Sequence, residues 1–372
     1  MALTIKEVKN NADLKEFIYL PEKIHKDHAN WLPPIYIDEK RYFNKDKNLA
    51  FRGCDTRMVL AFKDNKLVGR IMGIIQNQHN QAFNIKNVRF CFLECFNDQE
   101  VAHALITDIE NWGKEHGMNK IIGPFGFSDR DIQGLLIEGF EHEPVIDTAT
   151  NFEFMPELVI NEGFSKEMDC VIYRYELKNQ LPEIYDRIYD RITSRKDLTF
   201  QKFTSKKQLK PFIVPALKLM NECFGDIYGF VPMDEKEMLE FADRYLPILD
   251  LKFVKMVTKG DEMIAFLVNL PNLYKGIQKS KGRMFPFGFI HVLYALKHAE
   301  SANTMLGGVK QSYQKQGLDA YLTLSTMKTA REVGMKYVDT HVVMEENGDM
   351  MNEFKRYGAS LLKRFRVFQK NI

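Results

Sequence analysis

Two apolar runs separated by turn residues occur once in each half of the chain. Residues 58–75 (MVLAFKDNKLVGRIMGII) carry Asp-Asn at 64–65 between such runs, and residues 253–270 (FVKMVTKGDEMIAFLVNL) carry Gly-Asp at 260–261. Short apolar segments on either side of a two-residue turn signal are typical of a β-hairpin. The pattern therefore predicts one hairpin in each half.

Apolar residues at helical spacing also recur, and both times the pattern ends in Gly-Met. The two segments are 105–122 and 324–338. Each predicts an amphipathic helix followed by a strand. Gly117 and Gly334 suit the C-terminal end of a helix, where the backbone often needs a positive φ.

A third repeated segment shows how the two copies differ. Residues 156–175 resemble residues 352–369, and their glycines, Gly163 and Gly358, are 195 positions apart. The hairpins are 196 positions apart, and the Gly-Met glycines are 217 apart. These offsets fit two copies of one fold, with about 21 extra residues before the central helix of the second copy and about 22 after that of the first.

The second copy is expected to contain, in order, a strand, two helices, the hairpin, a strand, a helix, a strand, a helix and a strand: 198–203, 206–223, 234–246, 253–270, 305–311, 318–333, 336–344, 349–357 and 361–368. That order predicts a mixed, mostly antiparallel sheet with helices on both faces. The charged segment 182–197 is expected to be helical. We therefore expect an α/β (α+β) fold of two tandem domains, 1–178 and 198–372, joined by a helical linker at 179–197.

Composition narrows the class of protein. The 372 residues are 45% hydrophobic and 27% charged, and a net charge of +2 gives no overall field that would attract nucleic acid or a membrane. The N-terminal segment shows no apolar signal core, the longest apolar stretch (285–296) is shorter than the ~20 residues of a membrane span, and the five cysteines form no CxxC pair. His25 and His28 lack a third ligand nearby, so no metal is expected. We expect a cytoplasmic protein with reduced thiols and no nucleic-acid or membrane partner, and a homodimer is one open oligomeric state.

Residues 306–322 (LGGVKQSYQKQGLDAYL) contain the clearest candidate site. An apolar strand leads into a polar turn, and a helix begins at once. The turn consists of Gln314, Lys315, Gln316, Gly317, Leu318 and Asp319. A helix N-terminus offers free N–H groups and a partial positive charge to a phosphate, a glycine allows close approach, and a lysine adds a charged contact. The alternative is a tight strand-to-helix turn with no ligand.

This segment resembles the pyrophosphate loop of the GNAT acyltransferase superfamily, Arg/Gln-x-x-Gly-x-Gly/Ala. Supporting positions that also resemble the family are Val309, Tyr313, Leu322, Asn347, Met350, Tyr357 and Gly358. By order of elements the resemblance covers nearly the whole chain, and segments 123–140 and 282–289 resemble those of bacterial tandem-GNAT proteins. It implies that acetyl-CoA or a longer acyl-CoA binds through Val309, residues 314–319 and Asn347, and that Tyr357 protonates the departing thiolate.

The sequence departs from the family pattern at several positions. Asp319 replaces a small residue of the loop, and Phe354 stands where a catalytic tyrosine is common, which leaves Tyr357 as the nearest phenol. Glu345 and Glu346 follow a predicted strand and are candidates for a general base acting through water. The alternative for both is exposed loop charge.

Two segments outside this motif also bear on function. The loop 96–102 of the first copy has two acidic residues and no glycine, so this copy is not expected to bind coenzyme A. The insertion 275–296 begins with a basic cluster and continues as an aromatic-rich helix. It is either a solvated loop or a cover for an acyl chain or hydrophobic substrate.

Two functions from different classes remain open at this stage. The first is an enzyme that moves an acyl group from coenzyme A to the amine of a small molecule or peptide. The second is a non-catalytic module that binds acyl-CoA or another ligand, which Asp319 and Phe354 favour. A third possibility is transfer of an acyl group from another activated carrier, such as a carrier protein or aminoacyl-tRNA. It fits the tandem arrangement, but no motif in this sequence indicates it.

Overall fold

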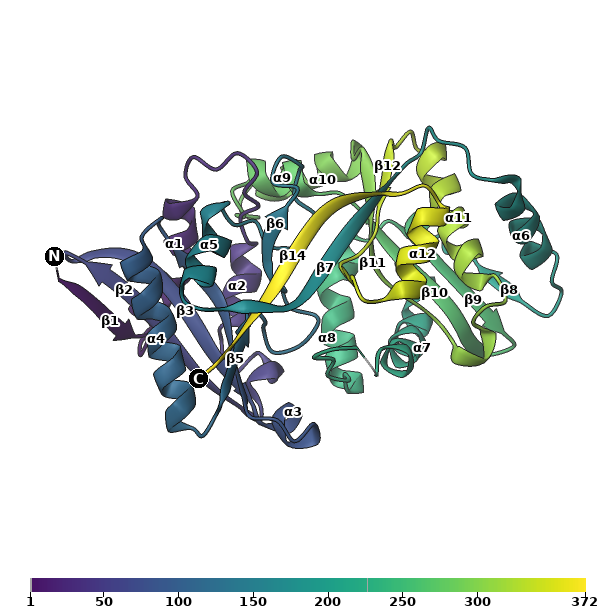
Figure 1. The fold of residues 1–372 in the computed structure, drawn as a ribbon. Helices are drawn as coiled ribbons and strands as arrows, with labels where there is room; N and C mark the ends of the chain where they lie inside the picture. Colours follow the sequence, from purple (N-terminus) through teal and green to yellow (C-terminus); the bar gives the residue numbers. More distant parts are fainter. Residues whose placement is uncertain (1, 226) are drawn as a thin grey trace.

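A computed structural model of the chain describes residues 2–225 and 227–372 (Figure 1). Within them fourteen strands form one sheet in the order β1-β2-β3-β4-β5-β14-β7-β12-β11-β10-β9-β8, with β6 beside β14 and β13 beside β7. The strands are β1 (Leu3–Glu7), β2 (Cys54–Lys63), β3 (Lys66–Gln76), β4 (Asn87–Cys95), β5 (Lys120–Gly123), β6 (Leu135–Glu138), β7 (Ser165–Glu176), β8 (Thr199–Gln201), β9 (Val254–Lys259), β10 (Glu262–Pro271), β11 (Ser301–Val309), β12 (Tyr337–Asp339), β13 (Val343–Met344) and β14 (Ser360–Asn371). The α-helices are α1 (Asn11–Ile24), α2 (Tyr36–Tyr42), α3 (Asn77–Ala82), α4 (Gln99–Glu115), α5 (Phe154–Asn161), α6 (Glu183–Thr193), α7 (Lys206–Phe224), α8 (Glu235–Tyr245), α9 (Tyr274–Lys279), α10 (Gly288–Lys297), α11 (Leu318–Glu332) and α12 (Gly348–Arg356).

The sheet contains the same strand order twice. Strands β1 to β5 run inward from one edge, and β8 to β12 run inward from the other. Both predicted hairpins are present: β2 and β3 turn at Asp64 and Asn65, with φ of 51° and 61°, and β9 and β10 turn at Gly260, with φ of 57°. Gly117 and Gly334 follow α4 and α11 with φ of 74° and 78°. The predicted α/β (α+β) fold with an internal repeat is confirmed.

The last strand of each copy lies on the other copy's side of the sheet. β14 pairs with β5 and β6 of the first copy, whereas β7 pairs with β12 and β13 of the second. β14 and β7 also pair with each other, and Figure 1 shows them side by side between the purple-blue and the green halves. The division into 1–178 and 198–372 stays a prediction, because the sheet continues across it.

Helices cover both faces of the sheet in each copy. In the first copy α4 and α5 share one apolar core with the sheet, and α1 and α2 share another on the opposite face. In the second copy α11 packs on one face, while α7 and α8 pack on the other. Among the described residues, none of the helices combines the length and apolar character that crossing a membrane requires.

The predicted extra residues of the second copy form α9 and α10, which pack against the first copy. Tyr274 Oη donates to the carbonyl of Ala29 at 3.1 Å, and the N–H of Tyr36 donates to the carbonyl of Gly282 at 3.0 Å. Arg283 also forms an ion pair with Glu22 at 2.8 Å. The insertion therefore helps to fix the two copies relative to each other.

Candidate functional site

Strands β11 and β12 of the second copy lie parallel for only three residue pairs and then separate. The pairs are 301/337, 302/338 and 303/339. Beyond them β12 turns toward β7, where the N–H of Thr340 donates to the carbonyl of Tyr173 at 2.8 Å, and β11 continues to Val309 along β10. The prediction of one strand over 336–344 is therefore wrong, since this divergence breaks it into β12 and β13. Beyond residue 303 the edge of β11 that faces away from β10 pairs with no other described strand, so its backbone groups can bind an extended ligand.

The predicted phosphate loop connects β11 to the N-terminus of α11. Gly317 precedes the helix with φ of 91°, and no side chain caps the helix end. Lys315 also has a positive φ, 58°, and its side chain is exposed. The first N–H groups of a helix have no acceptor within the helix, so an uncapped end attracts an anion. The loop therefore has the geometry of an anion site.

The other predicted loop residues support this conformation in different ways. Gln314 Nε2 donates to the carbonyl of Val309 at 3.2 Å, and Gln316 Nε2 donates to another loop carbonyl at 2.9 Å, so both amides brace the loop. Leu318 is fully buried and anchors the first turn of α11. Asp319 is exposed and does not cap the helix, which leaves the anion position open.

Helix α6 places a cation beside the loop that the sequence did not indicate. A Cβ built on Gly317 would lie 3.3 Å from Nη2 of Arg191 and 3.0 Å from a methyl carbon of Ile188. Arg191 is exposed and forms no ion pair with any described residue. A guanidinium in this place can add a contact to a phosphate held at the helix end. Arg191 lies in the segment that the sequence analysis interpreted as a linker. Its place beside Gly317 depends on the packing of α6 against the loop, which no sequence motif indicates.

The first copy has the same strand geometry but a closed helix end. β4 and β5 are parallel at 87/120, 88/121 and 89/122 before they separate. Asp98 caps α4 by accepting from the N–H of Glu100 at 3.1 Å. Lys63 forms ion pairs with the carboxylates of Asp98 and Glu100, at 2.6 and 2.8 Å. A carboxylate of the chain itself thus occupies the place where a phosphate would bind. This supports the expectation that the loop 96–102 does not hold coenzyme A.

Tyr357 lies at the end of α12 and its ring packs against Tyr185 of α6, with centroids 4.6 Å apart. Its Oη is buried and has no hydrogen-bond partner among the described residues. Burial raises the pKa of Tyr357 well above its usual value, so the phenol stays protonated. Its role as proton donor stays a prediction. Asn347 accepts from the N–H of Met350 at 3.2 Å as a plain helix cap, and its role toward the cofactor likewise stays a prediction.

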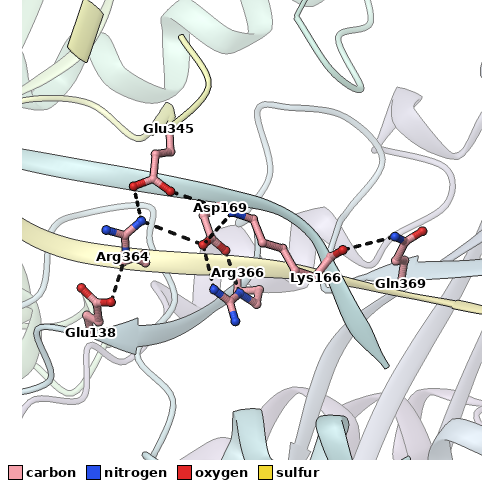
Figure 2. Close-up of polar contacts among 7 residues, drawn as sticks. All are labelled: Glu138, Lys166, Asp169, Glu345, Arg364, Arg366 and Gln369. Carbon is pink, nitrogen blue, oxygen red and sulfur yellow. Dashed lines mark hydrogen bonds and ion pairs between the residues drawn. The ribbon is translucent and has the colours of Figure 1, made fainter. Parts of the chain in front are cut away.

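Glu345, a candidate base, belongs to an ion-pair network between β7, β13 and β14 (Figure 2). It pairs with Arg364 and, at 3.9 Å, with Lys166. At the centre of the network Asp169 is buried and receives two hydrogen bonds of 2.8 Å from Arg366. These contacts hold the carboxylate of Glu345 within the network, and its role as a general base stays a prediction.

Asn303 is a buried polar residue that the sequence analysis missed. It occupies the last residue pair before β11 and β12 separate, and neither atom of its amide has a partner among the described residues. In the first copy Arg89 takes the same place, but its guanidinium donates to the carbonyls of Gly126 and Phe127 at 3.0 and 2.9 Å. An unsatisfied buried amide costs about 1–3 kcal/mol, so a polar ligand group between the strands would stabilise Asn303.

An apolar cavity of about 70 Å³ lies beneath α7 and α8, on the sheet face opposite α11. Two of its lining residues, Met305 and Leu306, belong to the part of β11 beyond the parallel pairs. The walls are completed by Leu209, Ile213, Ala216, Leu217, Phe241, Ala242, Tyr245, Leu246, Leu249, Val254, Met256, Phe266 and Val268. The cavity therefore adjoins the same stretch of strand as the candidate site.

The two histidines considered as metal ligands are engaged otherwise. His25 hydrogen-bonds to Glu94 through Nε2 and to His28 through Nδ1, both at 2.9 Å. Its ring stacks between Trp31 and Phe152, with centroids 5.1 and 5.0 Å away. In the part of the chain that the structure describes, no three His, Cys, Asp or Glu side chains are grouped as metal ligands would be.

Comparison with known proteins shows which fold the chain has. No model of a known protein family matches it. It is similar to Protein YghO of Escherichia coli, 27% identical over 98% of this chain and 94% of that protein, and to a bacterial ceramide synthase of Caulobacter vibrioides, 26% identical over 100% and 98%. Among solved structures, a tandem GNAT protein from the clavulanic acid biosynthesis pathway superposes with a TM-score of 0.57 at 9% identity, over 100% of this chain and 98% of that chain. A GCN5-related N-acetyltransferase from Sphaerobacter thermophilus gives 0.51 at 10% identity, over 99% and 95%. The chain therefore has the tandem GNAT fold, as the repeated segments and the resemblance to the family indicated.

Proposed function

We propose that the protein is an N-acyltransferase whose acyl donor, a coenzyme A thioester, binds in the second copy. The observation that carries the proposal is the uncapped N-terminus of α11 at Gly317, beside the separating strands β11 and β12. The capped α4 of the first copy is the internal contrast. One donor site per chain follows, with the pyrophosphate at the helix end and with Arg191 beside Gly317 and Lys315 of the loop as candidate cations.

The reaction needs few groups from the protein. The amine nitrogen attacks the thioester carbonyl, the C–S bond breaks, the amine loses a proton to solvent or a base, and the thiolate gains one. Tyr357 is proposed as the donor of that last proton from the resemblance to the GNAT family; burial keeps its phenol protonated but, by raising its pKa, also makes it a weaker acid. Most of the rate enhancement would come from holding donor and acceptor together.

We further propose a long acyl chain and an amino-alcohol lipid as acceptor. The apolar cavity beneath α7 and α8 adjoins β11 at Met305 and Leu306, where a chain attached to a thioester in the strand gap could enter. At about 70 Å³ the cavity holds only part of a long chain, so the rest requires α7 and α8 to move apart. A relative similar over nearly its whole length is named a ceramide synthase, and a ceramide is a long-chain amino alcohol acylated on nitrogen. Both observations support a lipid substrate over a peptide.

Calorimetric titration tests the donor site directly. Coenzyme A should bind with one site per chain, and absence of heat with coenzyme A, acetyl-CoA and palmitoyl-CoA would refute the proposal. Release of free thiol in the presence of a sphingoid base then separates an enzyme from a binding module. Tyr357→Phe should slow thiol release by about 10²–10⁴-fold without changing coenzyme A affinity, whereas Tyr321→Phe, another buried tyrosine of this copy, should leave both unchanged.

The cavity is tested by blocking it. Ala242→Phe places a ring in the cavity from α8. It should weaken palmitoyl-CoA binding by about tenfold or more while coenzyme A itself binds as before, because only the acyl chain needs the space. Unchanged binding of palmitoyl-CoA would show that the cavity does not receive the chain, whereas equal losses for both ligands would show that the substitution disturbs the fold.

A further inference from the structure

The insertion α9–α10 exposes a cluster of large apolar side chains. Of the large hydrophobic residues exposed in the described chain, six fall within ten consecutive positions: Phe285, Phe287, Phe289, Ile290, Leu293 and Tyr294. Phe285 is 75% exposed, Phe287 69% and Tyr294 65%. These six residues are called the aromatic patch below. Contiguous apolar surface of this kind marks a place where something else binds.

The aromatic patch faces away from the rest of the protein. α10 turns Val292 and Ala295 inward onto α9, where Val292 packs with Ile277 and Leu273. Its opposite side therefore carries the exposed residues. Figure 1 shows α9 and α10 along the upper margin of the molecule, over the junction of the two copies. The patch thus lies outside the fold and covers no core.

The segment that carries the aromatic patch contains only positive charge. Residues 273–298 contain five Lys and Arg residues and no Asp or Glu. Lys275 and Arg283 pair with carboxylates of the first copy, at 3.1 and 2.8 Å. Lys279, Lys281 and Lys297 are exposed and form no ion pair with any described residue. Lys297 follows Leu293 by one helical turn, so it borders the apolar face directly.

We propose that the aromatic patch and its three lysines bind the surface of an anionic lipid bilayer. Phe, Ile, Leu and Tyr side chains enter the boundary between headgroups and acyl chains, and unpaired lysines attract anionic headgroups. The occupant is a membrane and not a second copy of the chain for two reasons. A symmetric dimer through this patch would bring the lysines of both copies together, and ten residues are fewer than the 20–30 a side typical of a stable interface.

Vesicle flotation with the full chain tests the proposal. The protein should float with vesicles of phosphatidylcholine and phosphatidylglycerol, bind vesicles of phosphatidylcholine alone less, and dissociate as salt is raised. The apolar variant Phe285→Ser/Phe287→Ser/Ile290→Ser should lose at least about tenfold in partitioning. Phe83→Ser removes a similarly exposed ring, 62% exposed, from the first copy and should change nothing.

A charge variant separates the electrostatic part. Partitioning onto anionic vesicles should fall about fivefold for each lysine replaced in Lys279→Gln/Lys281→Gln/Lys297→Gln, and partitioning onto neutral vesicles should change little. Calorimetry with coenzyme A on the same samples, together with circular dichroism, reports whether each variant is folded, independently of membrane binding. Failure of the native chain to float, equal flotation of the apolar variant, or a dimer that this variant converts to monomer would each overturn the proposal.

Discussion

Replacing Gly317 by alanine isolates the contribution of the loop conformation to donor binding. The residue has φ of 91°, in a region that costs an L-residue about 1–2 kcal/mol. Its new Cβ would also lie 3.0 Å from Ile188, which must give way slightly. The loop can relieve the strain only by turning the N–H groups of the α11 terminus out of position. Coenzyme A affinity should therefore fall by about five- to thirtyfold, the equivalent of that strain.

Gly334 provides a matched control at the other end of the same helix. It has φ of 78°, and a Cβ there would meet no atom within 4 Å. Gly334→Ala should therefore lower the thermal midpoint about as much as Gly317→Ala but leave coenzyme A affinity unchanged. The assay is isothermal titration of both variants, with thermal unfolding in parallel. If Gly317→Ala binds as tightly as the native chain, or if Gly334→Ala weakens binding equally, the helix end is not the phosphate site.

Three further predictions follow from contacts of the same structure. Arg191→Ala should weaken coenzyme A binding several-fold at low salt and less at high salt, as seen by titration, whereas Arg187→Ala on the same helix should not. Asp98→Ala should destabilise the protein by about 1 kcal/mol in thermal unfolding by removing the cap of α4, and coenzyme A binding in the second copy should not change. Burial opposes the charge of Asp169, but hydrogen bonds from Arg366 and others outweigh it and lower the pKa of that carboxyl below its usual value. The stabilisation is therefore present above the unfolded-state pKa near 4 and is lost as pH falls through the folded value. The free energy of unfolding of Asp169→Asn should therefore decrease less than that of the native chain as the pH is lowered through the acid range.

Local features of the fold were predictable because short-range chemistry determines them. The turn at 64–65 and the glycines at 117 and 334 adopt the positive φ that their sequence patterns indicated. The helix after Gly317 begins where the loop motif placed it. Each of these depends on neighbours in the chain and not on distant partners.

Features that depend on partners far away in the sequence were not predictable. β7 and β14 belong to the segments 156–175 and 352–369 that resemble each other, and such a resemblance does not identify the strand beside which each lies. Arg191 and Asn303 matter only because α6 packs on the loop and because β12 departs from β11. For Glu345 the sequence showed an acidic residue after a strand, but the ion pairs with Arg364 and Lys166 come from two other strands.

The exchange of β7 and β14 also determines when the protein can finish folding. The first copy's sheet ends at β5, and the strand that must lie beside it, residues 360–371, is synthesised more than 200 residues after β5. At about 5–20 residues per second, that strand follows β5 by roughly ten seconds to a minute. Until then β5 has an open edge and β7 lacks one of its neighbours. Deletion of residues 360–371 would therefore damage the first copy, from which these residues are distant in sequence.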